Sequence, residues 1–161
     1  MALIIKGKVN TRPALCAKAW HVTTICSICN SSEGTANDLF TQCLLITGVW
    51  SFIKDRISMI RTPSSIDELW LVREIISDTR IHRLWPSVVL AYCWSIWRSR
   101  NELIFKKKEF NSQDIITNII FLINMWTELA PRKEEENLTK ALRLVNFPSY
   151  NQVQGMLSLR G

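Results

Sequence analysis

Apolar side chains recur every three or four residues from Asn37 onward, and this period limits the fold more than any other feature of the chain. In the first such run the apolar residues are Leu39, Phe40, Cys43, Ile46, Trp50 and Ile53. This spacing places them on one face of an α-helix, so we expect a helix over residues 37–60, with Gly48 as a weak point inside it. The chain also has seven Trp but only five Gly and five Pro, which argues against a β-sandwich with its many turns. The sequence therefore predicts an all-α fold.

Two further helices follow, each with a recognisable start. Ser65 follows a proline-containing break and can cap a helix that ends near Ile76, because a serine side chain accepts a hydrogen bond from an N–H group of the first turn. The next helix is expected to begin after Arg80 or at Pro86, since proline is tolerated in a first turn. It should continue to about Lys107.

The two ends of the chain differ from this helical centre. Residues 1–36 show no sustained period, so we expect an irregular segment with short helical or extended pieces at most. A fourth helix should open at Asn111 and end before Pro131. Residues 131–161 begin with the charged run PRKEEEN, and we expect a loose tail apart from a short helix near residues 138–145. The expected architecture is an irregular N-terminal segment followed by about four helices.

The apolar runs are too short for export or for membrane insertion. Five residues precede Lys6, and the longest run, residues 88–97, is about half the length that a membrane span needs. We therefore expect a cytoplasmic or nuclear protein without a membrane partner. In these compartments the five cysteines are better explained as reduced thiols and possible metal ligands than as disulfides.

Cys26 and Cys29 have the spacing of a zinc knuckle. Two intervening residues allow one tight turn to direct both sulfurs at a single ion. Cys43 adds a third sulfur from the first turns of the expected helix. The alternative is that Cys43 is a small buried apolar side chain, as many helix cysteines are. Spacing alone leaves both interpretations open.

The segment CSICNSSEGTANDLFTQCLLITGVW resembles the zinc-binding region that follows the polymerase in reverse transcriptases of plant non-LTR retrotransposons. That family has two cysteines, an acidic segment with threonine, Asp/Glu-His-Leu-Phe, a further cysteine and Val/Ile-Trp, in this order. The matching residues here are Cys26, Cys29, Glu33, Thr35, Leu39, Phe40, Cys43, Val49 and Trp50. Residues 94–105, WSIWRSRNELIF, are similar to the stretch Trp-x-x-Trp-x-x-Arg-Asn-x-x-x-Phe that links this module to a ribonuclease H domain, and KGKVNTRPALCAKAW matches the preceding segment in general character. The resemblance covers residues 6–130.

One metal ligand of that family is replaced in this chain. Asp38 stands where the family has a histidine ligand, so the resemblance implies a zinc site formed by Cys26, Cys29, Asp38 and Cys43. Zinc accepts carboxylate oxygen, but beside thiolates it does so less often than imidazole, and we expect reduced affinity. Two alternatives remain: Asp38 could be a helix cap and no ligand, and His21 could either fill the fourth position or lie apart from the site.

Basic side chains gather in two places in a chain whose net charge is +6. In the first 25 residues they are Lys6, Lys8, Arg12 and Lys18, with no Asp or Glu. The second group is Arg98, Arg100, Lys106, Lys107 and Lys108. Either group could hold the phosphates of RNA or DNA, and either could equally be an ordinary solvated loop or helix end.

The aromatic residues of this helix admit two interpretations. Tyr92, Trp94 and Trp97 could stack on the bases of single strands, because aromatic side chains beside arginine do so. Trp94 and Trp97 also share one face of the expected helix with Leu90, Asn101, Ile104 and Phe105, which is the pattern of a core. We therefore expect Trp50, Trp94, Trp97 and Phe105 to be mostly buried, and Arg100 and Asn101 would then cap or brace neighbouring backbone.

The sequence contains no arrangement of residues that indicates catalysis. Ribonuclease H chemistry needs several carboxylates that converge on metal ions, whereas the acidic residues here are scattered, and there is neither a glycine-rich phosphate loop nor a nucleophile triad. The resemblance implies a degenerate zinc-binding module in residues 1–60, a helical linker in 61–130 and the tail in 131–161. We expect a non-catalytic, zinc-binding module that associates with nucleic acid and has no small-molecule substrate. The alternative is a metal-free helical remnant or interaction domain without a nucleic-acid function.

Overall fold

The computed structural model describes residues 9–19, 21, 23–57, 62–149, 151, 152 and 155. Its elements in chain order are α2 (Arg12–Cys16), the π-helical turn η1 (Asp38–Gln42), α3 (Leu44–Ile57), α4 (Ile66–Ile75), α5 (Thr79–Lys106), α6 (Ser112–Glu128) and α7 (Arg132–Leu144). The described residues contain no β-strand, so the expected all-α class is confirmed. Within the same residues, no helix is both long enough and apolar enough to cross a membrane.

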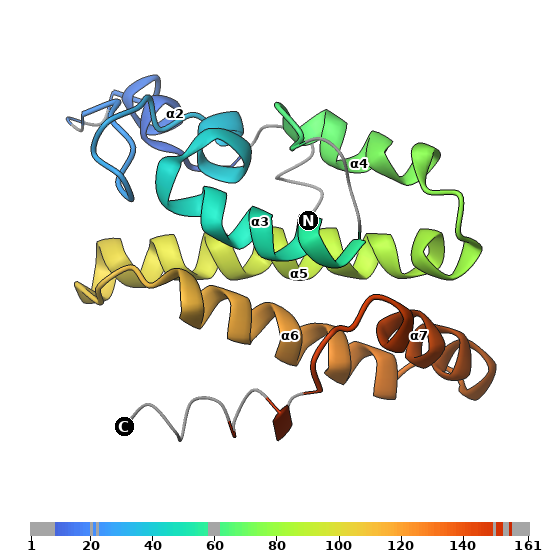
Figure 1. Cartoon of the computed structure of the whole chain (residues 1–161). Coiled ribbons are helices and arrows are strands. Elements are labelled where there is room, and N and C mark those ends of the chain that lie inside the picture. The colour runs from blue at the N-terminus through green and yellow to red at the C-terminus, as the bar shows by residue number, and fades with distance from the viewer. Residues whose placement is uncertain are drawn as a thin grey trace.

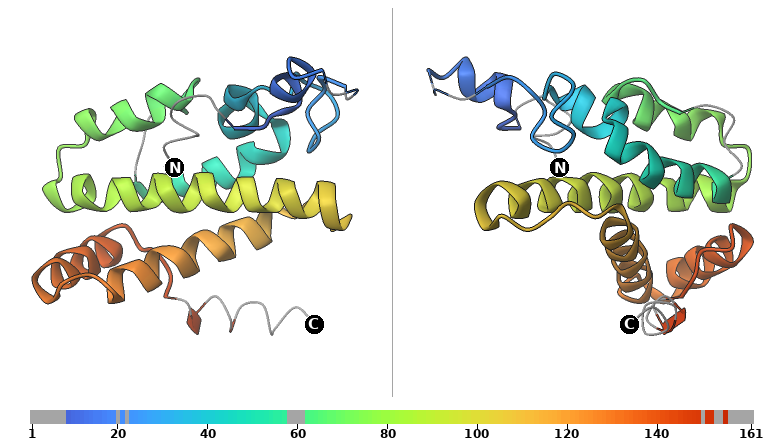
Figure 2. Two further views of the ribbon diagram at one scale, coloured as in Figure 1. Left: turned by 180° about the vertical axis from the view of Figure 1, so that it is seen from behind. Right: turned by 60° about the vertical axis from the view of Figure 1, so that its left-hand side comes forward.

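The 28-residue helix α5 is the centre of the molecule. Helices α3 and α4 lie on one side of it and α6 and α7 on the other, while the N-terminal segment lies over its C-terminal half (Figures 1 and 2). Helix α5 packs against α4, α6 and α7, and α3 packs against α6. The apolar side chains of these helices form one continuous core.

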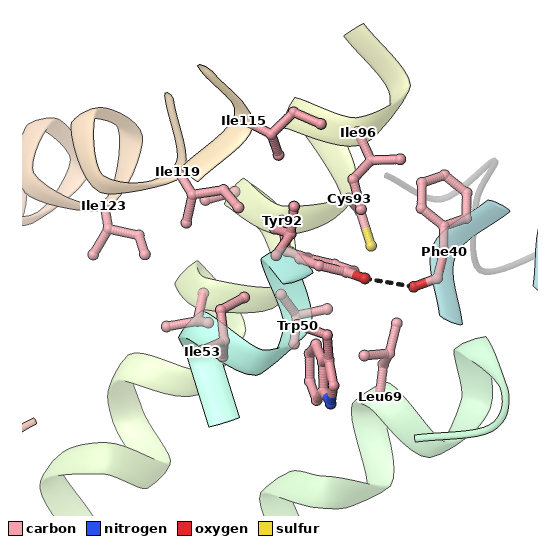
Figure 3. Packing of buried hydrophobic residues seen from close by; sticks show 14 of the residues in the cluster. Phe40, Trp50, Ile53, Leu69, Tyr92, Cys93, Ile96, Ile115, Ile119 and Ile123 are labelled. Carbon is pink, nitrogen blue, oxygen red and sulfur yellow. Dashed lines mark hydrogen bonds between the residues drawn. The ribbon is translucent and has the colours of Figure 1, made fainter. Parts of the chain in front are cut away.

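Tyr92 of α5 links three parts of this core. Its ring meets the Trp50 ring edge-on at a centroid distance of 5.4 Å, and Trp50 meets Trp85 at 6.2 Å. The Tyr92 hydroxyl donates to the backbone oxygen of Phe40 at 2.7 Å (Figure 3), and Trp85 Nε1 donates to the backbone oxygen of Leu69 at 2.8 Å. Because buried polar groups need partners, these two bonds fasten α5 to η1 and to α4.

Side-chain caps set the starts of three helices. Ser65 caps α4 and Asn111 caps α6 by accepting hydrogen bonds from first-turn N–H groups, so both expected starts are confirmed. Helix α5 begins slightly earlier than expected because Asp78 caps it, accepting from the N–H of Arg80 at 2.8 Å. The alternative start at Pro86 is therefore wrong, and this proline lies inside the helix.

The helix expected over residues 37–60 is divided at Cys43. This residue has extended backbone, with φ −63° and ψ 127°, and separates η1 from α3. Helix α3 continues through Gly48, the position expected to be weak. The interruption falls at the residue whose sulfur lies beside Cys26, a long-range contact that helical periodicity does not encode. Residues 58–60 lie outside the described residues.

Residues 132–144, expected to be loose except near their end, form the helix α7. Leu138, Ala141 and Leu142 are buried, and the helix packs against α5 and α6. The expectation of a loose tail is wrong for this part of the chain, because the spacing of its few apolar residues gives a charged segment one apolar face. Residues 156–161 lie outside the described residues.

Candidate metal centre

The chain between Thr24 and Gly34 doubles back on itself and carries two of the cysteines. The N–H of Cys26 donates to the Ser32 oxygen at 2.7 Å, and the N–H of Gly34 donates to the Thr24 oxygen at 2.8 Å. A Cβ atom at Gly34 would lie 3.1 Å from the Cα of Cys26, closer than ordinary contact, so the two arms of this loop can approach because one residue is glycine. The loop returns Cys29 to the neighbourhood of Cys26.

The sulfurs of Cys26, Cys29 and Cys43 all lie within 4.8 Å of one another. The Cys26 and Cys43 sulfurs are 3.9 Å apart. Two sulfurs bound tetrahedrally to one zinc ion at about 2.3 Å would be separated by about 3.8 Å, so this pair already has a suitable spacing. Cys26 and Cys43 are buried and Cys29 is half-buried. The three cysteines selected from the sequence are thus brought together by the fold.

The three thiols differ in acidity. Burial raises the pKa of Cys29, but hydrogen bonds from Ser31 and Ser32 outweigh this effect and lower that pKa to about 6. The hydrogen bond between Cys26 and Cys43 lowers the pKa of Cys26 and raises the pKa of Cys43, and burial adds to the rise at Cys43. Because the thiolate is the form that binds metal, Cys26 and Cys29 are closer to the binding form than an ordinary cysteine.

Asp38 does not belong to the group of converging ligand atoms. Its side chain lies outside the set of atoms within 4.8 Å of one another that the described residues contain. Asp38 is 4% exposed, and its Oδ2 has no hydrogen-bond partner among the described residues. The Asp38 side chain does not cap η1 either; instead, Thr35 Oγ1 accepts from the Asp38 N–H at 3.0 Å. His21, the other candidate ligand, is exposed and also lies outside the group.

The basic residues predicted to bind nucleic acid fall in several environments. Lys6 and Lys8 lie outside the described residues. Arg12 and Lys18 belong to the N-terminal segment, where their side chains donate to the side chains of neighbouring polar residues. At the C-terminal end of α5 and just after it, the exposed basic residues are Arg98, Lys106, Lys107 and Lys108.

Arg100 is 4% exposed, and this burial corrects the expectation that it holds a phosphate. Its Nη2 donates to the backbone oxygen of Asn10 at 3.0 Å, and its guanidinium lies 4.8 Å from the centre of the Trp97 ring. Burial lowers the pKa of Arg100, the charge of Arg12 lowers it further, and Cys26 opposes both effects. Arg100 therefore braces the N-terminal segment against α5, as the alternative interpretation held, and also sets a positive charge near a candidate metal ligand.

The aromatic residues of α5 divide between core and surface. Trp50 of α3 is buried as expected and Trp97 is half-buried, but Trp94 and Phe105 are 52% and 77% exposed. The core interpretation is therefore wrong for Trp94 and Phe105. At about 100° of rotation per residue, Trp94 lies about 200° around the helix from Tyr92, whose ring is in the core. The face of α5 that carries Trp94 and Phe105 is therefore turned away from the core.

Comparison with known proteins adds no constraint on this centre. No protein-family model, no curated protein and no solved structure matches the chain. The likeness to reverse transcriptases therefore rests on the residues quoted from the sequence. In chemical terms, three converging thiol sulfurs are the donors that zinc and other thiophilic ions prefer.

Proposed function

We propose that this chain is a non-catalytic zinc-binding module that associates with nucleic acid and derives from a reverse transcriptase of the plant non-LTR retrotransposon type. The observation that carries the proposal is the approach of three cysteine sulfurs to within 4.8 Å of one another. Two of them come from the loop of residues 24–34, and the third comes from Cys43, between η1 and α3. An ion held by all three would tie the loop to the helical core.

The residues of the centre fit zinc in number and kind for three of its four ligands. Structural zinc sites are closed by four ligands, most often thiolates and imidazoles. The buried Asp38 carboxylate is a candidate for the fourth, because its Oδ2 has no hydrogen-bond partner among the described residues and a buried carboxylate is costly without a compensating group. Water is the other candidate. Either donor is weaker than the histidine that the resemblance implies, so the affinity for zinc is reduced.

Positive charge near the centre supports the association with nucleic acid. Arg12 lines one small cavity together with Cys26 and Arg100, and Lys18 follows it in the same segment. With the loop fixed by an ion, Arg12 would be held beside it, and Lys18, which is exposed in the same segment, would add a second charge for phosphates. Binding through such contacts depends strongly on salt, because the nucleic acid releases counterions.

The alternative function, a helical domain without metal, is favoured by one observation. Protein groups already offer partners to the thiols, since Cys26 shares a hydrogen bond with Cys43 and Cys29 Sγ lies 3.2 Å from Ser32 Oγ. In that case the three cysteines would be small buried side chains that pack the loop.

Zinc content separates the two functions. We expect purified protein, kept reduced and dialysed against trace zinc, to contain one zinc per chain by plasma mass spectrometry. Cys26→Ser should lose the metal, whereas Cys16→Ser, which changes a half-buried cysteine outside the group, should retain it. A parent protein without zinc would refute the zinc proposal and leave the metal-free alternative.

The nucleic-acid part needs its own measurement. We expect the affinity of the parent for single-stranded RNA to fall steeply as salt rises from about 50 to 200 mM. Arg12→Gln combined with Lys18→Gln should weaken binding and flatten the salt dependence. Lys133→Gln combined with Lys140→Gln, which removes two exposed charges from α7, is the control for net charge. Equal losses in both variants would show that the N-terminal charges have no special role.

A further inference from the structure

Trp94, Arg98, Asn101 and Phe105 form an aromatic and basic stripe on α5. Their spacings of four, three and four residues place them on one face of the C-terminal half of the helix. Both aromatic rings are more than half exposed, and Arg98 is exposed between them. Large exposed rings that share one face are a common mark of an interaction surface. The function proposed above does not use this face.

The residues between the two rings restrict the kind of partner. An amphipathic helix that docks in a groove needs a continuous row of apolar contacts at helical spacing. On this stripe the two positions between Trp94 and Phe105 are the charged Arg98 and the polar Asn101. Isolated rings separated by a cation instead match the surfaces that bind single-stranded nucleic acid, where bases stack on aromatic side chains and cations contact the backbone.

The charges at the end of the helix complement such a partner. Glu102 is shared by three cations, with carboxylate oxygens 3.3 Å from Arg98 Nε, 3.8 Å from Lys106 Nζ and 3.5 Å from Lys108 Nζ. Lys108 also lies 3.7 Å from Asp114. Two carboxylates cannot neutralise three cations, and the charges are exposed enough to reorient, so phosphates can compete for them.

The length of the stripe suits a short strand. Trp94 and Phe105 are 11 positions apart, which corresponds to about 16 Å along an α-helix. At about 3.4 Å per stacked nucleotide, this distance spans about five nucleotides. A duplex would not serve, because its bases are already stacked on one another and their faces are covered.

We propose that this stripe binds single-stranded nucleic acid, with bases stacked on Trp94 and Phe105 and phosphates held by Arg98, Lys106 and Lys108. The inference rests on the proposed function only for the class of partner. It needs no metal, and it places the contact on α5 instead of on the cysteine loop. The basic N-terminal segment lies over the same half of α5 (Figure 2).

The test is a fluorescence anisotropy titration of a labelled oligoadenylate RNA of about 12 nucleotides with the full chain. We expect Trp94→Ala and Phe105→Ala each to weaken binding about tenfold or more. Trp94→Phe should retain much of the affinity of the parent for RNA, because a ring that can stack remains. Leu71→Ala, which truncates an exposed apolar residue of α4, should leave affinity unchanged. Circular dichroism should show that all variants are folded, since the substituted side chains are exposed.

The possible outcomes separate this inference from the proposed function. If both alanine variants bound the RNA as tightly as the parent does, the proposed role of the stripe would be refuted, while the association with nucleic acid would remain. Parent protein that does not bind RNA even at low salt would overturn both. A dimer of the parent that dissociates on Trp94→Ala, with RNA affinity unchanged, would assign the stripe to a second copy of the chain and also overturn the inference. A duplex that competes as well as the single strand would contradict base stacking.

Discussion

The substitution Tyr92→Phe tests whether the hydrogen bond between α5 and η1 holds the N-terminal segment to the helical core. The Tyr92 hydroxyl donates to the backbone oxygen of Phe40 at 2.7 Å, and both residues are fully buried. Removing the hydroxyl leaves the shape of the core almost unchanged but deprives a buried carbonyl of its partner. The carbonyl belongs to η1, the turn that leads directly to Cys43.

The expected cost follows from this geometry. An unpartnered buried carbonyl destabilises a fold by about 1–3 kcal/mol, whereas a hydrogen bond at the surface is readily replaced by water. We therefore expect Tyr92→Phe to lower the free energy of unfolding by about 1–3 kcal/mol. Urea unfolding followed by circular dichroism should show a lower midpoint with an unchanged slope.

A matched control separates burial from the loss of a hydroxyl. Thr47 Oγ1 donates to the Leu44 backbone oxygen at 2.6 Å on an exposed part of α3, so Thr47→Val should change stability by no more than about 0.5 kcal/mol. If Tyr92→Phe were as stable as the parent, the Phe40 carbonyl would have another partner, and the hydrogen bond would not be what fastens η1 to α5.

Three further predictions concern ionisable groups. Asp38→His should tighten zinc binding in competition with a chromogenic chelator, because imidazole is a better partner for three thiolates; equal affinity would mean that residue 38 is not a ligand. Hydrogen bonds from Arg80 lower the pKa of Asp78 to about 2, below its unfolded value of about 3.9. The stability from this carboxylate is therefore present above about pH 4 and lost as the pH falls to about 2. Between these pH values the melting temperature of Asp78→Asn should therefore fall less than that of the parent. Equal decreases in the two proteins would contradict this prediction. In metal-free protein near pH 7, iodoacetamide should alkylate Cys29 before Cys93, whose pKa burial raises to about 12, and zinc should protect Cys29; mass spectrometry that found Cys93 modified first would oppose the assignment.

The sequence predicted those parts of the fold that depend on local signals. The caps Ser65 and Asn111 lie beside the helices they start, so a short window contains all the information. The interruption at Cys43 coincides with a contact to Cys26, 17 positions earlier. The face that α5 turns to the core includes Tyr92, which bonds to Phe40, 52 positions away. Such contacts cannot be inferred from the period of a single helix, and for this reason the period alone predicts the wrong environment for Trp94.

The candidate site was predictable to a similar extent. The spacing of Cys26 and Cys29 encodes a turn that brings two sulfurs together, and the third cysteine was found with the help of the family resemblance. The position of Asp38 in the sequence does not determine where its carboxylate points, and the structure leaves it outside the group. The sequence shows that Arg100 is charged but not that it is buried, so it predicts a place for Arg100 on a basic surface. The contact of Arg100 with Asn10 is set by the fold.

X-ray absorption at the zinc edge is the most direct test of the central claim that three cysteines form one zinc site. For the full chain loaded with one equivalent of zinc, the account predicts three sulfur ligands at about 2.3 Å and one nitrogen or oxygen ligand at about 2.0–2.2 Å. Cys43→Ser should reduce the sulfur count by one, since the Cys43 sulfur is one of the three that lie together and would join the loop to the core through the ion. A spectrum with one sulfur or none, or protein that does not retain zinc under these conditions, would contradict the account.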